Sequence, residues 1–352
     1  MREQSIKAKK QILSILVLLL LIAITFFFYL RGYSFQALWS AMKNANPAYL
    51  LAGLGMMLVF ILCEAVNIRV ILKTLGQKAP LLRCLEYSNI GFYFSSITPS
   101  ASGGQPAQIY YMKQDTIPVA MSSATIFFVV YVYQIAMLLL GLIMSLLHTS
   151  AAAYFIHQLN YLFLFGVVVN TSVIFILFAL MFSKRLVPAI ASVLFKVGRH
   201  LHLVKKEEQT KDKFDKSLIS FHDKAMLLKD HPTLFVKVLL ITMLQMISIN
   251  LIPSLVYLSM GYGSKQLVNI FTCQSLLTIS VSPVPLPGAE GVTQGGFLQV
   301  FGAYFPKDIL PYAMLINRCI SFYLPLIISL LFYILTHIRT TKQSARGDMI
   351  DR

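Results

Sequence analysis

The chain carries the sequence TPSASGGQP at residues 98–106 and the sequence PLPGAEGVTQGG at residues 285–296. Both stretches interrupt apolar segments, and one lies in each half of the chain. Proline and glycine release backbone groups from helical hydrogen bonding, and such groups must be buried in protein or line a wet cavity because they cannot face lipid. Broken apolar segments at matching places in two halves are typical of transporters whose site lies near the middle of the membrane.

The composition is that of a membrane protein. Hydrophobic residues make up 57% of the chain and charged residues 12%, with a mean hydropathy of +0.71. Crossing a bilayer as a helix takes about 20 apolar residues. We predict six crossings, over residues 12–30, 47–66, 119–147, 161–182, 233–260 and 310–335. The predicted fold is therefore an all-α polytopic membrane protein with an inverted structural repeat and two Pro/Gly-broken re-entrant segments.

The formal net charge of +16 follows the predicted crossings. Basic residues gather most densely over residues 184–229, whereas the loop predicted at residues 150–160, on the outer side, has no Lys or Arg. Basic loops stay on the cytoplasmic side, so we expect a multi-pass membrane protein with both termini in the cytoplasm. A basic loop without an aromatic platform or a recognised motif is a weak nucleic-acid signal, and no nucleic-acid partner is expected.

The N-terminal apolar run at residues 12–30 follows a basic stretch, as a secretory signal does. It is longer than the usual apolar core of a signal peptide, and no small-x-small cleavage site follows it. We therefore expect a retained first helix. The predicted organisation is an integral membrane domain over residues 1–340, comprising a first repeat at about 47–182, a basic linker at 183–232 and a second repeat at 233–338, followed by a cytosolic tail at 341–352.

The linker is the long polar stretch of the sequence. Within it, residues 187–197 are apolar and flanked by basic residues, which favours a segment lying along the inner membrane surface. Residues 205–216 carry mixed charges and are expected to form a solvated helix or loop.

One offset relates the two halves. Pro99 and Pro287 are 188 residues apart, as are Gly103 and Gly291, and also Pro118 and Pro306. Shifted by the same amount, the crossing at 47–66 falls inside the crossing at 233–260. Three full crossings separate the starts of the two repeats, so the halves are expected to face opposite ways, with one broken segment entering from each side of the membrane.

Polar residues at membrane depth are candidates for the site because they are costly there. The glycines of the broken segments can expose backbone amides to an anion or, alternatively, serve tight helix crossing. The candidate headgroup-binding residues are Pro99, Gly103, Gly104, Gln105, Pro287, Gly288, Glu290, Gly291, Gln294, Asn317 and Arg318, with Glu64, Glu86 and Gln134 as supporting candidates.

Arg318 allows two interpretations. Its planar guanidinium suits the phosphate of a lipid headgroup. The alternative is a structural ion pair with Glu290 or Glu86 that holds helices together. Gln134, alone on an apolar helix, is more typical of an interhelical hydrogen bond.

Motifs of enzyme catalysis are missing from the sequence. It contains no GxSxG, no Walker loop and no HExxH. The seven histidines form no metal-ligand pattern, and the four cysteines form no CxxC pair and are interpreted as small buried hydrophobes. No metal or cofactor is expected.

The two broken motifs together resemble those of the lysylphosphatidylglycerol synthase transmembrane family. The first match runs from Ile97 to Pro106 and is followed by Tyr110-Tyr111-Met112, and the second runs from Pro285 to Phe297. The resemblance covers roughly residues 12–338. The sequence departs from the family pattern at Gln105 and Gln294, where many relatives carry Glu, so a carboxylate role at those positions does not transfer.

The resemblance implies a flippase-like transporter of an anionic or aminoacylated phospholipid, similar to lysyl-phosphatidylglycerol, or of a lipid-linked glycan. In bacterial members of the family such transport alters envelope charge and gives resistance to cationic peptides, so the resemblance also implies a bacterial cell membrane protein. The alternative is a phosphatidylglycerol lysyltransferase, or the membrane partner of a synthase. We expect the synthase domain of full-length family members to be absent from this chain. A third alternative is a membrane scaffold that transports nothing. The expected partners are membrane lipids.

Overall fold

The structure is a computed structural model that describes residues 43, 45–183 and 207–350. All regular secondary structure in these ranges is helical, as the sequence predicts. Within these ranges five helices are long and apolar enough to cross a membrane, namely Pro47–Thr74, Val119–Leu147, Thr149–Phe182, Pro232–Ser259 and Leu310–Thr341. The predicted crossing at residues 12–30 and the apolar segment at 187–197 lie outside the described residues.

In each half a long helix is followed by two shorter helices joined through a 3₁₀ turn and then by another long helical segment. The first half contains α3 (Pro47–Thr74), α4 (Leu81–Ile97), the 3₁₀ turn η1 (Pro99–Ala101), α5 (Gly104–Gln114), α6 (Val119–Leu147) and α7 (Thr149–Phe182). After α9 (Glu207–Lys229), the second half contains α10 (Pro232–Ser259), η2 (Ser264–Gln266), α11 (Leu267–Val281), η3 (Pro287–Ala289), α12 (Val292–Phe301), α13 (Leu310–Arg318), the π-helical turn η4 (Cys319–Tyr323) and α14 (Leu324–Ile350).

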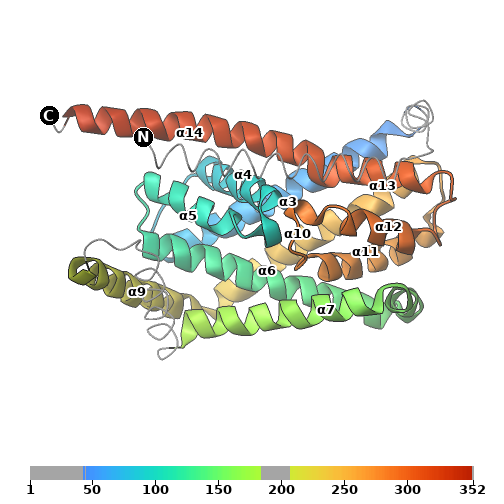
Figure 1. Ribbon diagram of the computed structural model, residues 1–352, viewed down its shortest axis with the longest axis horizontal. Helices are drawn as coiled ribbons and strands as arrows, with labels where there is room; N and C mark the ends of the chain where they lie inside the picture. The colour runs from blue at the N-terminus through green and yellow to red at the C-terminus, as the bar shows by residue number, and fades with distance from the viewer. Residues whose placement is uncertain (1–42, 44, 184–206, 351–352) are drawn as a thin grey trace.

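The two broken segments are helical hairpins that meet at their tips. Figure 1 shows α4 and α5 in one half of the long axis of the molecule and α11 and α12 in the other half. The turns η1 and η3, which join the helices of each hairpin, lie against each other. This arrangement is what the predicted inverted repeat requires, and the orientation of the two halves in a membrane stays a prediction.

Prolines at helix starts set several of these boundaries. Pro47 and Pro232 occupy the first turn of α3 and α10, where the missing N–H costs nothing. Asn46 caps α3, since its side-chain oxygen accepts a hydrogen bond from the amide of Ala48 at 3.0 Å.

The loop predicted at residues 150–160 is wrong, because α7 begins at Thr149 and is helical through this stretch with a local break at Leu159 (φ −133°, ψ 37°). Ala151, Ala152 and Phe155 are buried in the main core. The segment is apolar enough to pack against neighbouring helices, and this burial overrides its position between two predicted crossings.

The segment expected as a solvated helix or loop at 205–216 contributes to α9, which begins at Glu207 and extends to Lys229. The second half of α9 is not fully solvated. Phe221, Ala225 and Leu228 are buried in a core that includes residues of α3, α4 and α6, so α9 packs onto the bundle through an apolar stripe.

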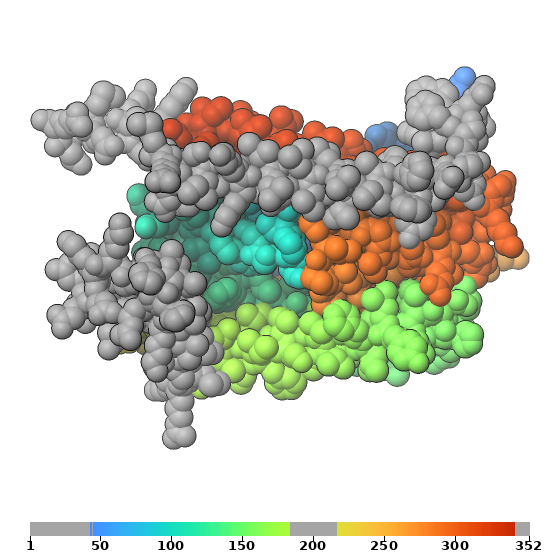
Figure 2. Space-filling model, viewed as in Figure 1, coloured from blue at the N-terminus to red at the C-terminus, as the bar shows by residue number. Residues whose placement is uncertain are grey.

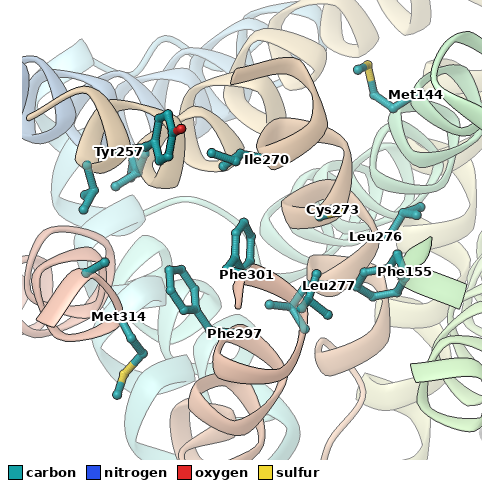
Figure 3. Packing of buried hydrophobic residues seen from close by; sticks show 14 of the residues in the cluster. Met144, Phe155, Tyr257, Ile270, Cys273, Leu276, Leu277, Phe297, Phe301 and Met314 are labelled. Atoms are coloured by element: carbon teal, nitrogen blue, oxygen red, sulfur yellow. The ribbon is translucent and has the colours of Figure 1, made fainter. Parts of the chain in front are cut away.

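The main core surrounds the second hairpin. Figure 3 shows Phe297 and Phe301 projecting from α12 into the space between α11 and α13. Their rings stack with centroids 4.3 Å apart, and both side chains are fully buried. Large aromatic side chains at this point hold α12 at a defined height against α11.

The outer surface of the bundle is apolar along α7, the long green band in Figure 2. Only 11% of its most apolar window is buried in the protein. Its exposed residues include Tyr161, Leu164, Val168, Phe175 and Ile176. Exposed apolar area of this extent is typical of a helix that faces lipid.

Candidate functional site

The turn η3 reverses the chain at the tip of the second hairpin. Gly288, Ala289 and Gly291 have left-handed backbone conformations, with φ of 60°, 49° and 81°. At Gly288 a side chain is also excluded by space, because a Cβ atom would collide with the ring of Phe322. The glycine therefore allows the backbone to lie directly against η4.

A buried ion pair joins η3 to the last crossing. The guanidinium Nη2 of Arg318 lies 2.5 Å from Oε1 of Glu290, and the two side chains are 9% and 0% exposed. The same Nη2 also donates to the carbonyl of Gly288 at 2.9 Å. Arg318 thus binds the broken segment through both its backbone and its carboxylate, which confirms the predicted pairing with Glu290.

Two neutral side chains complete the surroundings of Glu290. Gln294 donates from Nε2 to Oε2 of Glu290, and its own Oε1 accepts the amide hydrogen of Gly291 at 2.8 Å. The hydroxyl of Tyr323 lies 3.5 Å from the same carboxylate oxygen. Each carboxylate oxygen therefore has a donor, as a buried charge requires.

Arg318 also stacks on an aromatic face. Its guanidinium carbon lies 4.2 Å from the ring centroid of Phe322, close enough for a cation–π interaction. Its Nε is buried without a hydrogen-bond partner, and so is Oδ1 of the neighbouring Asn317. Arg318 therefore keeps one buried hydrogen-bond donor that its partners in the site do not use.

The turn η1 has the same geometry with a more exposed surface. Ser100 and Ala101 are left-handed, with φ of 50° and 53°, and residues 99–102 are exposed. Thr98 closes the turn, because its hydroxyl donates to the carbonyl of Phe94 at 2.6 Å and accepts from the amide of Gly103 at 2.9 Å. Pro99 begins η1, as Pro287 begins η3.

Two glycines of the first motif serve close packing. A Cβ atom on Gly104 would lie 2.7 Å from the carbonyl oxygen of Gly91, and one on Gly103 would lie 2.7 Å from the side chain of Thr98. These positions bear out the tight-crossing interpretation of Gly103 and Gly104. The amide of Gly103 is used by Thr98, as described above, and is not presented to an anion.

Gln105 lines an open groove on the surface between α5 and α6. The groove has a volume of about 340 Å³. Its walls are formed mainly by apolar side chains of α5 and α6, and its lining residues are Gln105, Pro106, Ile109, Tyr110, Lys113, Val119 and Phe127. Gln105 lies next to η1 and Lys113 at the far end of α5, so the groove follows the helix away from the tip of the hairpin.

The supporting candidates do not join the central cluster. Glu86 is paired with Arg83 at 3.0 Å and with Arg339 at 2.9 Å, so the alternative pairing of Glu86 with Arg318 is wrong. Arg339 also contacts Asp115 at 3.0 Å. This network ties the end of α14 to the α4–α5 hairpin.

The other two supporting candidates, Glu64 and Gln134, lie on α3 and α6. Glu64 accepts a hydrogen bond from Gln108 at 2.7 Å. Oε1 of Gln134 is buried without a hydrogen-bond partner, so the interhelical bond expected of this side chain is not formed through its oxygen.

Several residues of the site were not indicated by the sequence. Phe322 lies against Arg318, and Tyr323 lies near Glu290; both belong to the π turn η4, which leaves no composition signal. Arg339 lies beyond the predicted last crossing at 310–335 and was not a candidate, and Gln108 was not singled out because it is a single amide in a polar stretch. Only tertiary packing brings these residues to their partners.

Comparisons with known proteins agree with this architecture. The model of a family described as the lysylphosphatidylglycerol synthase TM region matches residues 11–329, which include both broken motifs. A UPF0104 membrane protein of Archaeoglobus fulgidus is 24% identical over 296 residues, which make up 81% of this chain and 85% of that relative. These matches confirm the resemblance that the two motifs indicated.

Proposed function

Because this chain belongs to the family of the lysylphosphatidylglycerol synthase transmembrane region, we propose that it moves a lipid with a phosphate-bearing headgroup across the membrane. The observation that carries the proposal is the buried guanidinium of Arg318, which keeps an unused Nε donor at the junction of η3 and η4. A permanent cation at membrane depth is costly and is therefore a candidate for a functional role.

The pairing of Arg318 with Glu290 explains how an anion could be bound and released. A phosphate oxygen is chemically equivalent to a carboxylate oxygen as a partner of guanidinium, and both accept paired hydrogen bonds. A headgroup phosphate can therefore exchange with Glu290 at Arg318 while the cation stays neutralised throughout. In the absence of lipid, Glu290 closes the site.

In the predicted topology the two hairpins enter from opposite sides of the membrane, so together they supply a path for the headgroup across it. Their tips η1 and η3 lie against each other, and the groove along α5 leads from Lys113 to Gln105 beside η1. Its apolar walls suit an acyl chain, and Lys113 suits an anionic headgroup at the mouth. Opposed movements of the hairpins would then transfer the headgroup past Arg318.

The test is translocation of fluorescent phosphatidylglycerol in liposomes that contain the purified chain, with a membrane-impermeant quencher reporting the outer leaflet. Arg318→Gln is expected to reduce the rate at least tenfold. Arg69→Gln is the matched control, because Arg69 lies exposed on α3 and should retain the wild-type rate.

Arg318→Gln also leaves Glu290 without its cation, so misfolding has to be separated from lost transport. The double variant Arg318→Gln/Glu290→Gln contains no unpaired charge at this position and is expected to fold and to remain inactive. Wild-type translocation by either variant would overturn the proposal.

A further inference from the structure

Glu64 is an acidic side chain within α3 that forms no ion pair with the described residues. Its Oε1 accepts a hydrogen bond from Nε2 of Gln108 at 2.7 Å. Among the described residues, the ion pairs involve Glu86, Asp115 and Glu290 but not Glu64. The side chain is partly buried and belongs to a helix apolar enough to cross the membrane, where an isolated carboxylate is costly.

The packing of α3 against α10 places the side-chain amide of Gln245, which has no hydrogen-bond partner, at the same level along the helices as Glu64. The amide of Asn46 bonds to the carbonyl of Ser259, and Asn67 bonds to Thr242, so the two helices are antiparallel. Glu64 lies one turn before Asn67, and Gln245 lies one turn after Thr242. Glu64 and Gln245 therefore share one level of the interface.

Two side-chain amide oxygens at this level accept no hydrogen bond. Gln245 is 1% exposed, and neither its oxygen nor its nitrogen has a hydrogen-bond partner. Asn67 donates to Thr242 at 2.9 Å, but its Oδ1 is buried and unsatisfied as well. An ionised carboxylate can only accept hydrogen bonds, whereas a protonated one also donates. A proton on Glu64 would add a donor at this level, where Oε1 of Gln245 and Oδ1 of Asn67 have no hydrogen-bond partner.

We propose that Glu64 is a proton-binding site and that its proton is the ion coupled to lipid movement, an inference that rests on the transport function proposed above. In the step itself a water-borne proton forms an O–H bond at Oε2 of Glu64, with the electron pair supplied by that oxygen. On release the bond breaks and the proton returns to water.

The link to transport runs through Gln108. This residue lies on α5, in the hairpin that carries η1, and its amide packs so tightly on α4 that a Cβ atom on Gly91 would collide with it. Gln108 therefore moves with the hairpin. When the hairpin shifts, Glu64 loses or regains its donor, so its affinity for a proton changes with the conformation.

The other titratable groups nearby leave Glu64 as the proton site. Tyr133 of α6 interacts electrostatically with it, but a phenol is neutral near pH 7. Charged groups on the helices that surround Glu64 do not pair with it within the described residues; they are Arg69 and Lys73 on α3, Arg83 and Glu86 on α4, Lys113 on α5 and Lys237 on α10.

The first experiment measures phosphatidylglycerol translocation in the same liposomes with and without a pH gradient. In the wild type the gradient is expected to accelerate translocation at least threefold. Glu64→Gln should abolish this acceleration, and Arg69→Gln on the same helix should retain it. A wild-type rate that responds to a sodium gradient but not to a pH gradient would overturn the proposal in favour of a metal cation.

A second measurement does not depend on transport. Infrared difference spectra between acidic and alkaline pH should show a protonated carboxyl band that Glu64→Gln removes. Gln108→Leu keeps the carboxyl but deletes its donor, so the band should persist to higher pH. If the band is unchanged in Glu64→Gln, proton binding at Glu64 is wrong. If the band behaves as expected while the wild type translocates no lipid, the transport function fails and proton binding stands.

Discussion

Arg318 and Glu290 form an ion pair at 2.5 Å in which both side chains are buried, although they lie in different helical segments. The pair connects the tip of the second hairpin with the π turn of the last crossing. A buried pair of this kind adds little net stability compared with apolar residues, but breaking it strands a charge. The pair lies between the left-handed turn η3 and the π turn η4, as expected if a headgroup phosphate replaces Glu290 at Arg318 in the proposed transport.

The first prediction concerns the stranded charge. Glu290→Gln should lower the free energy of unfolding by about 3–5 kcal/mol, because Arg318 stays buried without its anion. Adding Arg318→Gln should recover part of the loss. Thermal unfolding of both variants in detergent measures this, and strictly additive effects would show that the two side chains are not coupled.

The second prediction concerns the turn η3. Gly288→Ala should destabilise the protein by about 1–3 kcal/mol, because the backbone is left-handed there and the new methyl group meets Phe322. Gly55→Ala is the control, since a Cβ atom on Gly55 meets nothing within 4 Å and alanine favours the helix. An equal thermal shift for the two variants would contradict the argument.

The third prediction concerns the contact between α7 and the second hairpin. Asn170 donates from Nδ2 to the carbonyl of Ile279 at 3.0 Å and to the hydroxyl of Ser282 at 2.9 Å. Asn170→Ala should cost about 1 kcal/mol, the scale of interhelical hydrogen bonds in membranes. Ser172→Ala removes only a bond within α7 and should leave the melting temperature almost unchanged; a larger shift than that of Asn170→Ala would refute the assignment.

The fourth prediction tests the inverted arrangement. Lys78 lies exposed before α4, and Lys265 lies exposed before α11. The variants Lys265→Cys and Lys78→Cys are each made in a chain that carries Cys319→Ala. Lys265→Cys should react with an impermeant maleimide on intact cells, whereas Lys78→Cys should react only after permeabilisation. Labelling of both from the same side would exclude two hairpins that enter from opposite leaflets.

Much of the fold could be predicted from local patterns. The crossings expected at 119–147 and 233–260 correspond closely to α6 and α10, because apolar length and flanking prolines are local properties. The predicted broken segments contain the turns η1 and η3, whose left-handed residues follow Pro99 and Pro287. The loop predicted at 150–160 was wrong because the burial of this stretch depends on α11 and α12, which lie far away in the sequence.

The candidate site could be predicted only in part, because the sequence shows polar residues in apolar segments but not their distant partners. Glu290 and Arg318 were both identified from their cost at membrane depth, and one of the two proposed pairings was correct. Gly103 and Gly104 lie in close contact with the end of α4 and with Thr98, and Glu86 belongs to a separate network with Arg83 and Arg339. A sequence shows which groups need a partner, but not which of several partners lies within reach.

By itself, the sequence determined that this protein is a helical membrane protein with two broken segments, because apolar length, proline and glycine act within a few residues of the chain. Only the tertiary structure decided that Arg318 meets Glu290, that Phe322 covers Gly288 and that Glu64 and Gln245 lie at one level of the interface between α3 and α10. These contacts depend on how helices distant in sequence pack, and the free energy of a buried polar group is set by the partner it meets there.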